Sequence, residues 1–207
     1  MTHSVVPQGP DETARAFLAA LDAKAWDAAA AYVLPQLAKR TQAGELSMLL
    51  AFVELQASGH PMESGYSIAT DGKVDPGLLE RFGGVPARGV RGTTTVAELA
   101  DLTPEAFIAR TLENAVAGPT EMPWPPIRYQ FVGLVVENDT VAHVLIRELQ
   151  MDGDGEWRPM MDDRAAVQVL GVRRVDGRWY VVPDWMLLSR GNSAFTAMRV
   201  GEDPDPS

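Results

Sequence analysis

The sequence contains no cysteine, which excludes disulfides, thiolate catalysis and cysteine-ligated metal sites. Positive charge is also scarce, because 18 lysines and arginines stand against 28 aspartates and glutamates and the net charge is −10. Nucleic acids and anionic membranes attract proteins through Lys and Arg, so we expect neither as a partner. Catalysis would have to rest on carboxylate, histidine, tyrosine or hydroxyl groups, and we expect no cofactor and no metal.

Long apolar runs are missing as well. No stretch approaches the ~18 consecutive apolar residues of a membrane-spanning helix. Residues 1–10 have neither the basic nor the apolar region of a signal peptide, so we expect a cytoplasmic protein. The chain of 207 residues, 46% hydrophobic and 22% charged, is long enough for one domain with a sizeable core.

Helical periodicity dominates the first part of the chain. Apolar residues at helical spacing predict a helix that begins at Asp11, a second helix around Trp26 that Pro35 ends or kinks, and a third over 45–57. A fourth helix should begin at Thr103, which is followed by a proline and an acidic residue, as is typical of a helix start.

Glycine and proline interrupt the pattern between residues 60 and 100, where we expect an irregular insertion. Asp75 and Pro76 predict a short helix up to Phe82 within it. One short strand is expected over 66–69 or 90–96.

The C-terminal half predicts a sheet. Strands are expected over 127–137, 140–151 and 178–186, with one more inside 157–175 that is clearest from Ala165. Asn138-Asp139 and Asp176-Gly177 are tight-turn signals between consecutive strands. Helices followed by an antiparallel meander indicate the α+β class.

Two parts of this order resemble a known family. The segments 16–21, 25–30 and 171–179 are similar to the opening and the ending of the nuclear transport factor 2-like superfamily. This superfamily includes steroid isomerase-like, polyketide cyclase-like (SnoaL-like) and limonene epoxide hydrolase-like proteins. The resemblance covers roughly residues 11–34 and 103–187.

The resemblance implies a cystatin-like fold, in which N-terminal helices pack on a curved antiparallel sheet to form a cone with a pocket at its open end. It also implies a homodimer through the sheet. We therefore expect one cone-shaped domain over 11–187, with the insertion at about 60–100 inside it and a C-terminal extension with an acidic tail over 188–207. One scaffold of this kind carries many activities, so function has to be argued from pocket residues.

Asp184, Arg147 and His143 are candidate catalytic residues. The resemblance points to the first two, and His143 is the only histidine inside an expected regular element. In the epoxide hydrolase-like proteins an acid late on the last strand works in the pocket, and Asp184 occupies that place, on the strand face of Tyr180 and Val182. An arginine on the Arg147 strand holds two aspartates in those proteins, one of them two residues further on. Here Leu149 stands at that position and no Tyr-x-Asn pair is present, so an intact epoxide hydrolase mechanism is not expected.

Each candidate also has a simpler interpretation. Asp184 could be a solvated residue at a strand end, and Arg147 could form a salt bridge to a neighbouring strand. His143 could titrate near neutral pH as a base or could serve only in packing.

Four aromatic residues are candidates for ligand binding: Tyr32, Trp26, Tyr129 and Trp185. The steroid isomerase-like proteins use a helix tyrosine as an oxyanion donor, and Tyr32 could take that role or pack in the core. Residues 152–156 superficially resemble a calcium loop, but Trp157 stands where such a loop needs glycine, so we expect no metal there.

Three functions remain open. The first is a small-molecule-binding protein whose cone pocket takes an apolar ligand. The second is a cofactor-independent isomerase, lyase or hydrolase that uses a pocket carboxylate on an apolar substrate. The third is a protein interaction module that uses the face of the sheet.

Overall fold

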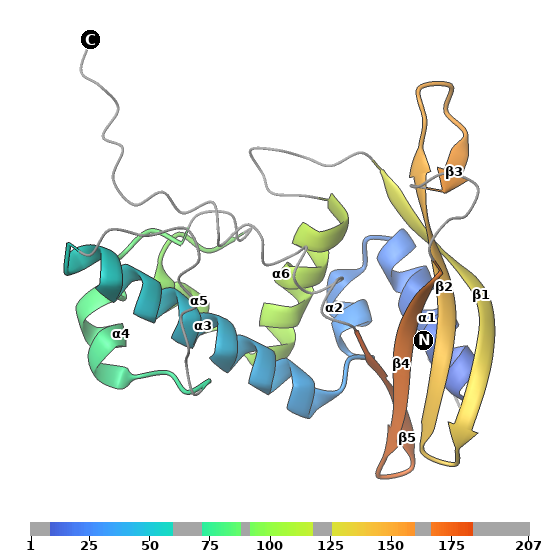
Figure 1. Ribbon diagram of the computed structural model, residues 1–207, viewed down its shortest axis with the longest axis horizontal. Helices are drawn as coiled ribbons and strands as arrows, with labels where there is room; N and C mark the ends of the chain where they lie inside the picture. The colour runs from blue at the N-terminus through green and yellow to red at the C-terminus, as the bar shows by residue number, and fades with distance from the viewer. Residues whose placement is uncertain (1–8, 60–71, 88–91, 118–125, 160–166, 184–207) are drawn as a thin grey trace, which may run out of the picture.

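The computed structural model describes residues 9–59, 72–87, 92–117, 126–159 and 167–183 (Figure 1). Six helices precede five strands in this part of the chain. The helices are α1 (Pro10–Asp22), α2 (Trp26–Ala30), α3 (Pro35–Ala57), α4 (Pro76–Phe82), α5 (Val96–Ala100) and α6 (Pro104–Ala117). The strands are β1 (Ile127–Asn138), β2 (Val141–Met151), β3 (Trp157–Pro159), β4 (Gln168–Val175) and β5 (Arg178–Val182).

Helix α3 differs from the expectation, because it begins at Pro35 rather than near residue 45. Helix α2 has already ended at Ala30, so the proline starts a helix instead of ending one. The reason is that the first N–H groups of a helix have no partner inside it, so a residue that lacks an N–H fits there without loss. The predicted starts of α1 and α6 are confirmed to within a residue.

The insertion contains more regular structure than its glycines and prolines suggest. Helix α4 forms as predicted, and the Asp75 side chain accepts hydrogen bonds from the backbone N–H groups of Gly77 and Leu78. The alternative of a strand over 90–96 is wrong at its end, because Val96 begins helix α5. A capping box of Thr95 and Glu98 starts this helix. The other alternative, 66–69, lies outside the described residues.

The five strands form one antiparallel sheet in the order β1-β2-β4-β5, with β3 paired to β2. The single strand expected within 157–175 is therefore two strands. Asp176 and Gly177 both have positive φ, 50° and 80°, as a two-residue type I′ hairpin turn requires. The α+β class and the antiparallel meander are confirmed.

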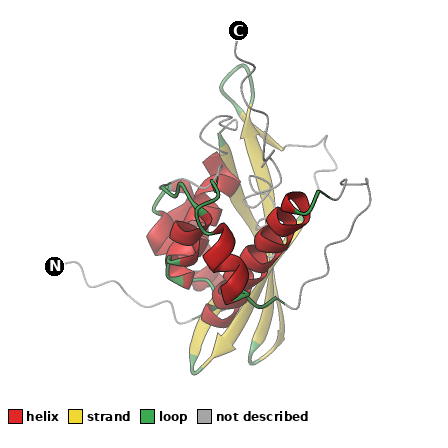
Figure 2. Ribbon diagram, turned by 90° about the vertical axis from the view of Figure 1, so that its left-hand side faces the viewer, coloured by secondary structure: helices red, strands yellow, loops and turns green. Residues whose placement is uncertain are grey.

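All the helices lie on one side of the sheet (Figure 2). Helix α1 packs directly on the strands, α2 packs on α1 and α6, and α3 packs on α6, α4 and α5. The chain after α2 also completes one edge of the sheet. The backbone N–H of Val181 in β5 donates to the Tyr32 carbonyl at 2.7 Å, and the N–H of Leu34 donates to the Val181 carbonyl at 2.9 Å.

The core extends from the side of the sheet that faces α1, which we call the helix-facing side, into the spaces between the helices. Strand alternation places Ala142, Val144 and Ile146 of β2 on the helix-facing side, together with Leu170 and Val172 of β4, and all five are buried. The opposite side is called the outer face. No helix of the described residues is both long and apolar enough to cross a membrane.

Candidate functional site

His143 and Arg147 lie on the outer face of the sheet. Both belong to β2 and alternate with its buried residues, so they share a face as the sequence predicts. Four residues separate them, which is about 13 Å along a strand. The His143 ring nitrogen Nε2 lies 2.8 Å from Glu137 Oε2, and this pair is exposed. The structure does not bring the two residues together around one reacting atom.

Arg147 sits among apolar neighbours. Leu145 and Leu149 flank it on its own strand, and Gln130 lies opposite it on β1. The side chain is half-buried, and its Nε is buried without a hydrogen-bond partner among the described residues. The salt bridge to a neighbouring strand that the sequence left open is therefore not formed within the described part of the chain.

Asp184 and Trp185 lie outside the described residues, so their roles stay predictions. The alternation that was used to place Asp184 is confirmed over the described part of β5. Trp179 and Val181 are buried on the helix-facing side, whereas Tyr180 and Val182 are half-buried on the outer face.

The three other aromatic candidates lie in two different places. Trp26 and Tyr32 are half-buried and pack against the core from α2 and from the turn after it. Tyr129 is buried on β1, on the helix-facing side of the sheet. Of the three, only Tyr129 belongs to the sheet itself.

Glu148 is the residue that sequence reasoning missed. It is only 7% exposed, it lies on the helix-facing side of β2, and the register of β1 and β2 places it directly opposite Tyr129. Directly opposed residues of an antiparallel pair have Cβ atoms about 5 Å apart, so the carboxylate and the phenol ring share one small region. Burying a carboxylate is costly unless it has partners, and Glu148 and Tyr129 each take part in an interaction within the protein.

The polar character of this region extends to its neighbours. The next helix-facing residue of β2 is Gln150, and Gln168 of β4 lies opposite Ile146. Toward the middle of the sheet, the helix-facing residues of β2 and β4 are apolar. Polar groups therefore gather at the end of the sheet where β3 begins, next to an apolar core, and this combination is typical of a small-molecule site.

Asp22 lies at the edge of this region. The C-terminus of α1 brings its carboxylate to the open edge of β1, where it accepts a hydrogen bond from the backbone N–H of Tyr129 and lies 3.4 Å from Arg128 Nε. Burial raises the pKa of Asp22 above its usual value, and this effect outweighs the lowering by Arg128 and by the Tyr129 N–H. The Arg128 guanidinium also stacks on the Trp157 ring.

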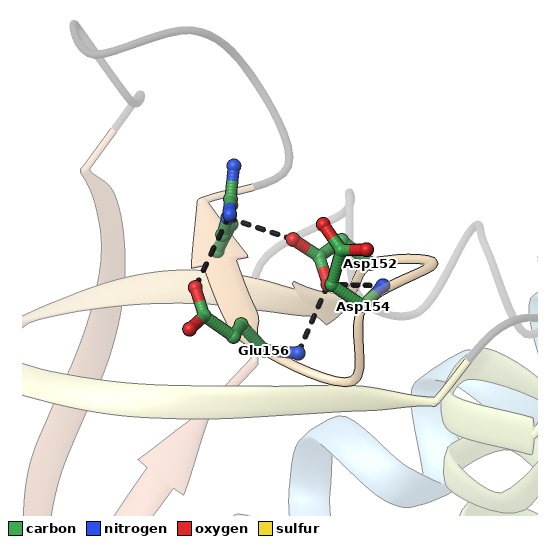
Figure 3. A network of polar contacts seen from close by, with 4 residues as sticks. Asp152, Asp154 and Glu156 are labelled. Atoms are coloured by element: carbon green, nitrogen blue, oxygen red, sulfur yellow. Dashed lines mark hydrogen bonds and ion pairs between the residues drawn. The ribbon is translucent and has the colours of Figure 1, made fainter.

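In the acidic loop between β2 and β3, the carboxylates of Asp152 and Glu156 have partners within the loop and at Arg158 (Figure 3). Asp152 Oδ1 accepts hydrogen bonds from the N–H groups of Asp154 and Glu156, both at 2.9 Å. Its Oδ2 lies 2.7 Å from Arg158 Nε. These hydrogen bonds, that from Glu156 first, lower the pKa of Asp152. No group of three metal-binding side chains occurs among the described residues.

Comparisons with models of protein families, with curated proteins and with solved structures find no match to this chain. The relationship to the nuclear transport factor 2-like superfamily therefore stays a prediction. The chemistry of the site has to be argued from Tyr129, Glu148 and their neighbours alone.

Proposed function

We propose that this protein binds an apolar small molecule in a pocket on the helix-facing side of the sheet, at the end that carries Tyr129 and Glu148. One observation carries the proposal: a buried carboxylate and a buried tyrosine lie opposite each other in neighbouring strands, next to the apolar core.

The two side chains suit the recognition of a single polar group on an otherwise apolar molecule. A carboxylate accepts hydrogen bonds and a phenol both donates and accepts them. A charge-assisted hydrogen bond in a poorly solvated site is stronger than one at the surface, so one such contact would orient the ligand.

A thermal-shift screen of apolar compounds tests this proposal. A bound ligand raises the melting temperature by mass action, and a ligand that uses the site should lose this shift in Glu148→Gln. Arg147→Gln is the matched control, because it makes a similar change one residue away on the opposite face, and it should keep the shift. Asp184→Ala should keep it as well. A panel in which every hit shifts Glu148→Gln as strongly as the wild type would refute the proposed site.

A second function rests on the same buried carboxylate. Glu148 could act as a general acid or base in a cofactor-independent isomerase, lyase or hydrolase, with the Tyr129 hydroxyl as hydrogen-bond donor to the substrate. In that case Glu148→Gln should reduce turnover of a converted ligand by roughly 10²- to 10⁴-fold, the usual contribution of a general acid or base. A variant that still binds and still turns over at the wild-type rate would remove this second candidate.

A further inference from the structure

The outer face of the sheet is unusually apolar for a surface. Val135 and Val169 lie on it with about half of each side chain exposed. Leu145 lies beside Val169, and Leu149 and Val182 are half-buried on the same face. No helix lies on this side in the described part of the chain (Figure 2). Contiguous exposed apolar surface on a folded protein usually marks a site of association.

Arg147 lies near the centre of this face, and Arg128, Arg173 and Arg178 lie on the same face nearer its edges. The neighbours of Arg147 along and across the strands are Leu145, Leu149 and Gln130, none of which carries a negative charge. Among the described residues of this face, the acidic one is Glu137, which His143 holds at the far end of the strands. The Nε of Arg147 is buried inside the protein without an acceptor, and an unpaired buried donor is costly, so a carboxylate close to this guanidinium would be favoured.

A second copy of the same face would not supply it. The homodimer through the sheet that the family resemblance implies would place Arg147 of each copy in an interface whose acidic residue is already engaged by a histidine. Like charges that are buried together without a counter-ion repel each other, and proteins commonly use this repulsion to reject a wrong partner.

We infer that the outer face docks a different protein, one that presents a carboxylate between aliphatic side chains. Charge complementarity decides the choice of partner: the carboxylate pairs with the Arg147 guanidinium, for which a bidentate ion pair is the natural geometry. The aliphatic side chains of the partner cover Val135, Val169 and the two leucines beside Arg147.

The protein itself provides the sharpest probe. Arg147→Glu carries the same apolar face with a carboxylate in place of the guanidinium, so it has the chemistry of the inferred partner. We expect wild type and Arg147→Glu each to sediment as monomers, and their equimolar mixture to form a 1:1 complex that weakens as salt rises. In the control, wild type is mixed with Arg147→Gln, which carries no charge at this position, and this mixture should stay monomeric. Val169→Lys in the wild-type partner should abolish the complex.

Three results would overturn the inference. A wild-type dimer at the same concentration would show that a second copy covers the face. An equimolar mixture that remains monomeric would show that the face has no affinity for a carboxylate among apolar groups. Retention of a single-stranded oligonucleotide that is lost in Arg147→Gln would replace the protein partner by a nucleic acid.

A second probe covers the case in which Arg147→Glu does not fold. A short strand-forming peptide with alternating leucines and one central glutamate is titrated into the ¹⁵N-labelled wild type, alongside the same peptide with glutamine. The glutamate peptide should shift the amide signals of Leu145, Arg147 and Val169, and the glutamine peptide should shift them far less. Equal shifts with both peptides, or none with either, would contradict the inference.

Discussion

The two sides of the sheet differ although they are built from alternate residues of the same strands. In β4, Leu170 is 2% exposed under the helices, whereas its neighbour Val169 is 48% exposed on the outer face. In β2, Glu148 is buried toward the helices and Arg147 lies among leucines on the other side. The comparison teaches that one strand can serve the core and a binding surface at once, because its side chains alternate.

The largest effect is expected from truncating one side chain on each face of β4. Leu170→Ala removes a fully packed side chain and should lower the free energy of unfolding by about 2–5 kcal/mol. Val169→Ala, one residue away, should change it by less than about 0.5 kcal/mol. Urea unfolding of both variants measures the difference.

Similar losses in the two variants would break the comparison. They would mean that Val169 is covered in solution, as it would be if copies of the chain associated through the outer face.

A smaller, pH-dependent effect is expected at Asp22, where the helix-facing side meets the open edge of β1. Because burial raises the pKa of Asp22, the folded protein holds this proton more tightly than the unfolded chain does. The contribution of this proton to the stability of the folded protein is therefore fully present below the ordinary pKa of an aspartate. It is lost as the pH rises through the raised pKa of Asp22.

Asp22→Asn removes this titration while keeping an acceptor for the Tyr129 N–H. Relative to the wild type, the variant should gain stability as the pH rises from about 3.8 toward neutral. The gain should stay below roughly 1 kcal/mol, because the site is partly exposed and the ion pair with Arg128 is lost. Urea unfolding at several pH values measures it. A difference between the proteins that does not change with pH would show that the carboxylate is not perturbed.

The smallest effect is expected in the β2–β3 loop, which belongs to neither face. Asp152→Ala removes the acceptor of two backbone N–H groups, so the amide of Glu156 should exchange faster with solvent. Because these hydrogen bonds lower the pKa of Asp152, the loop should loosen in the wild type as the pH falls through that lowered value.

Asp154→Ala is the control for this loop, since the network uses the backbone N–H of that residue and not its carboxylate. The control should leave the exchange of the Glu156 amide unchanged. Faster exchange in both variants would mean that the Asp152 hydrogen bonds do not hold the loop.

Much of the fold could be predicted because local signals are strong where the structure is regular. The turn at Asp176-Gly177 and the alternation from Trp179 to Val182 depend on nearby residues alone. The start of α3 was missed because proline is common both at the first position of a helix and just after the end of one. The sequence around Pro35 does not distinguish the two cases. Helix α5 was missed although its signal, Thr95 followed by Glu98, was present.

The candidate site was harder to predict, because the sequence of a strand does not show which of its two faces the helices will cover. The sequence grouped His143 with Arg147 correctly, but it could not say that this group lies away from the helices. The signal for Glu148 was an acidic residue that continues the apolar series Ala142, Val144 and Ile146. A charge at a core position of a strand is a better marker of a site than a charge on its polar side.

The central claim is that the two faces of β2 do different work, with ligand binding at Glu148 and protein docking at Arg147. The most direct test measures both activities on the same two variants: the ligand-induced thermal shift, and complex formation with Arg147→Glu. Glu148→Gln should lose the thermal shift and keep the complex, and Arg147→Gln should keep the thermal shift and lose the complex. Loss of both activities in either variant would contradict the separation of the two faces.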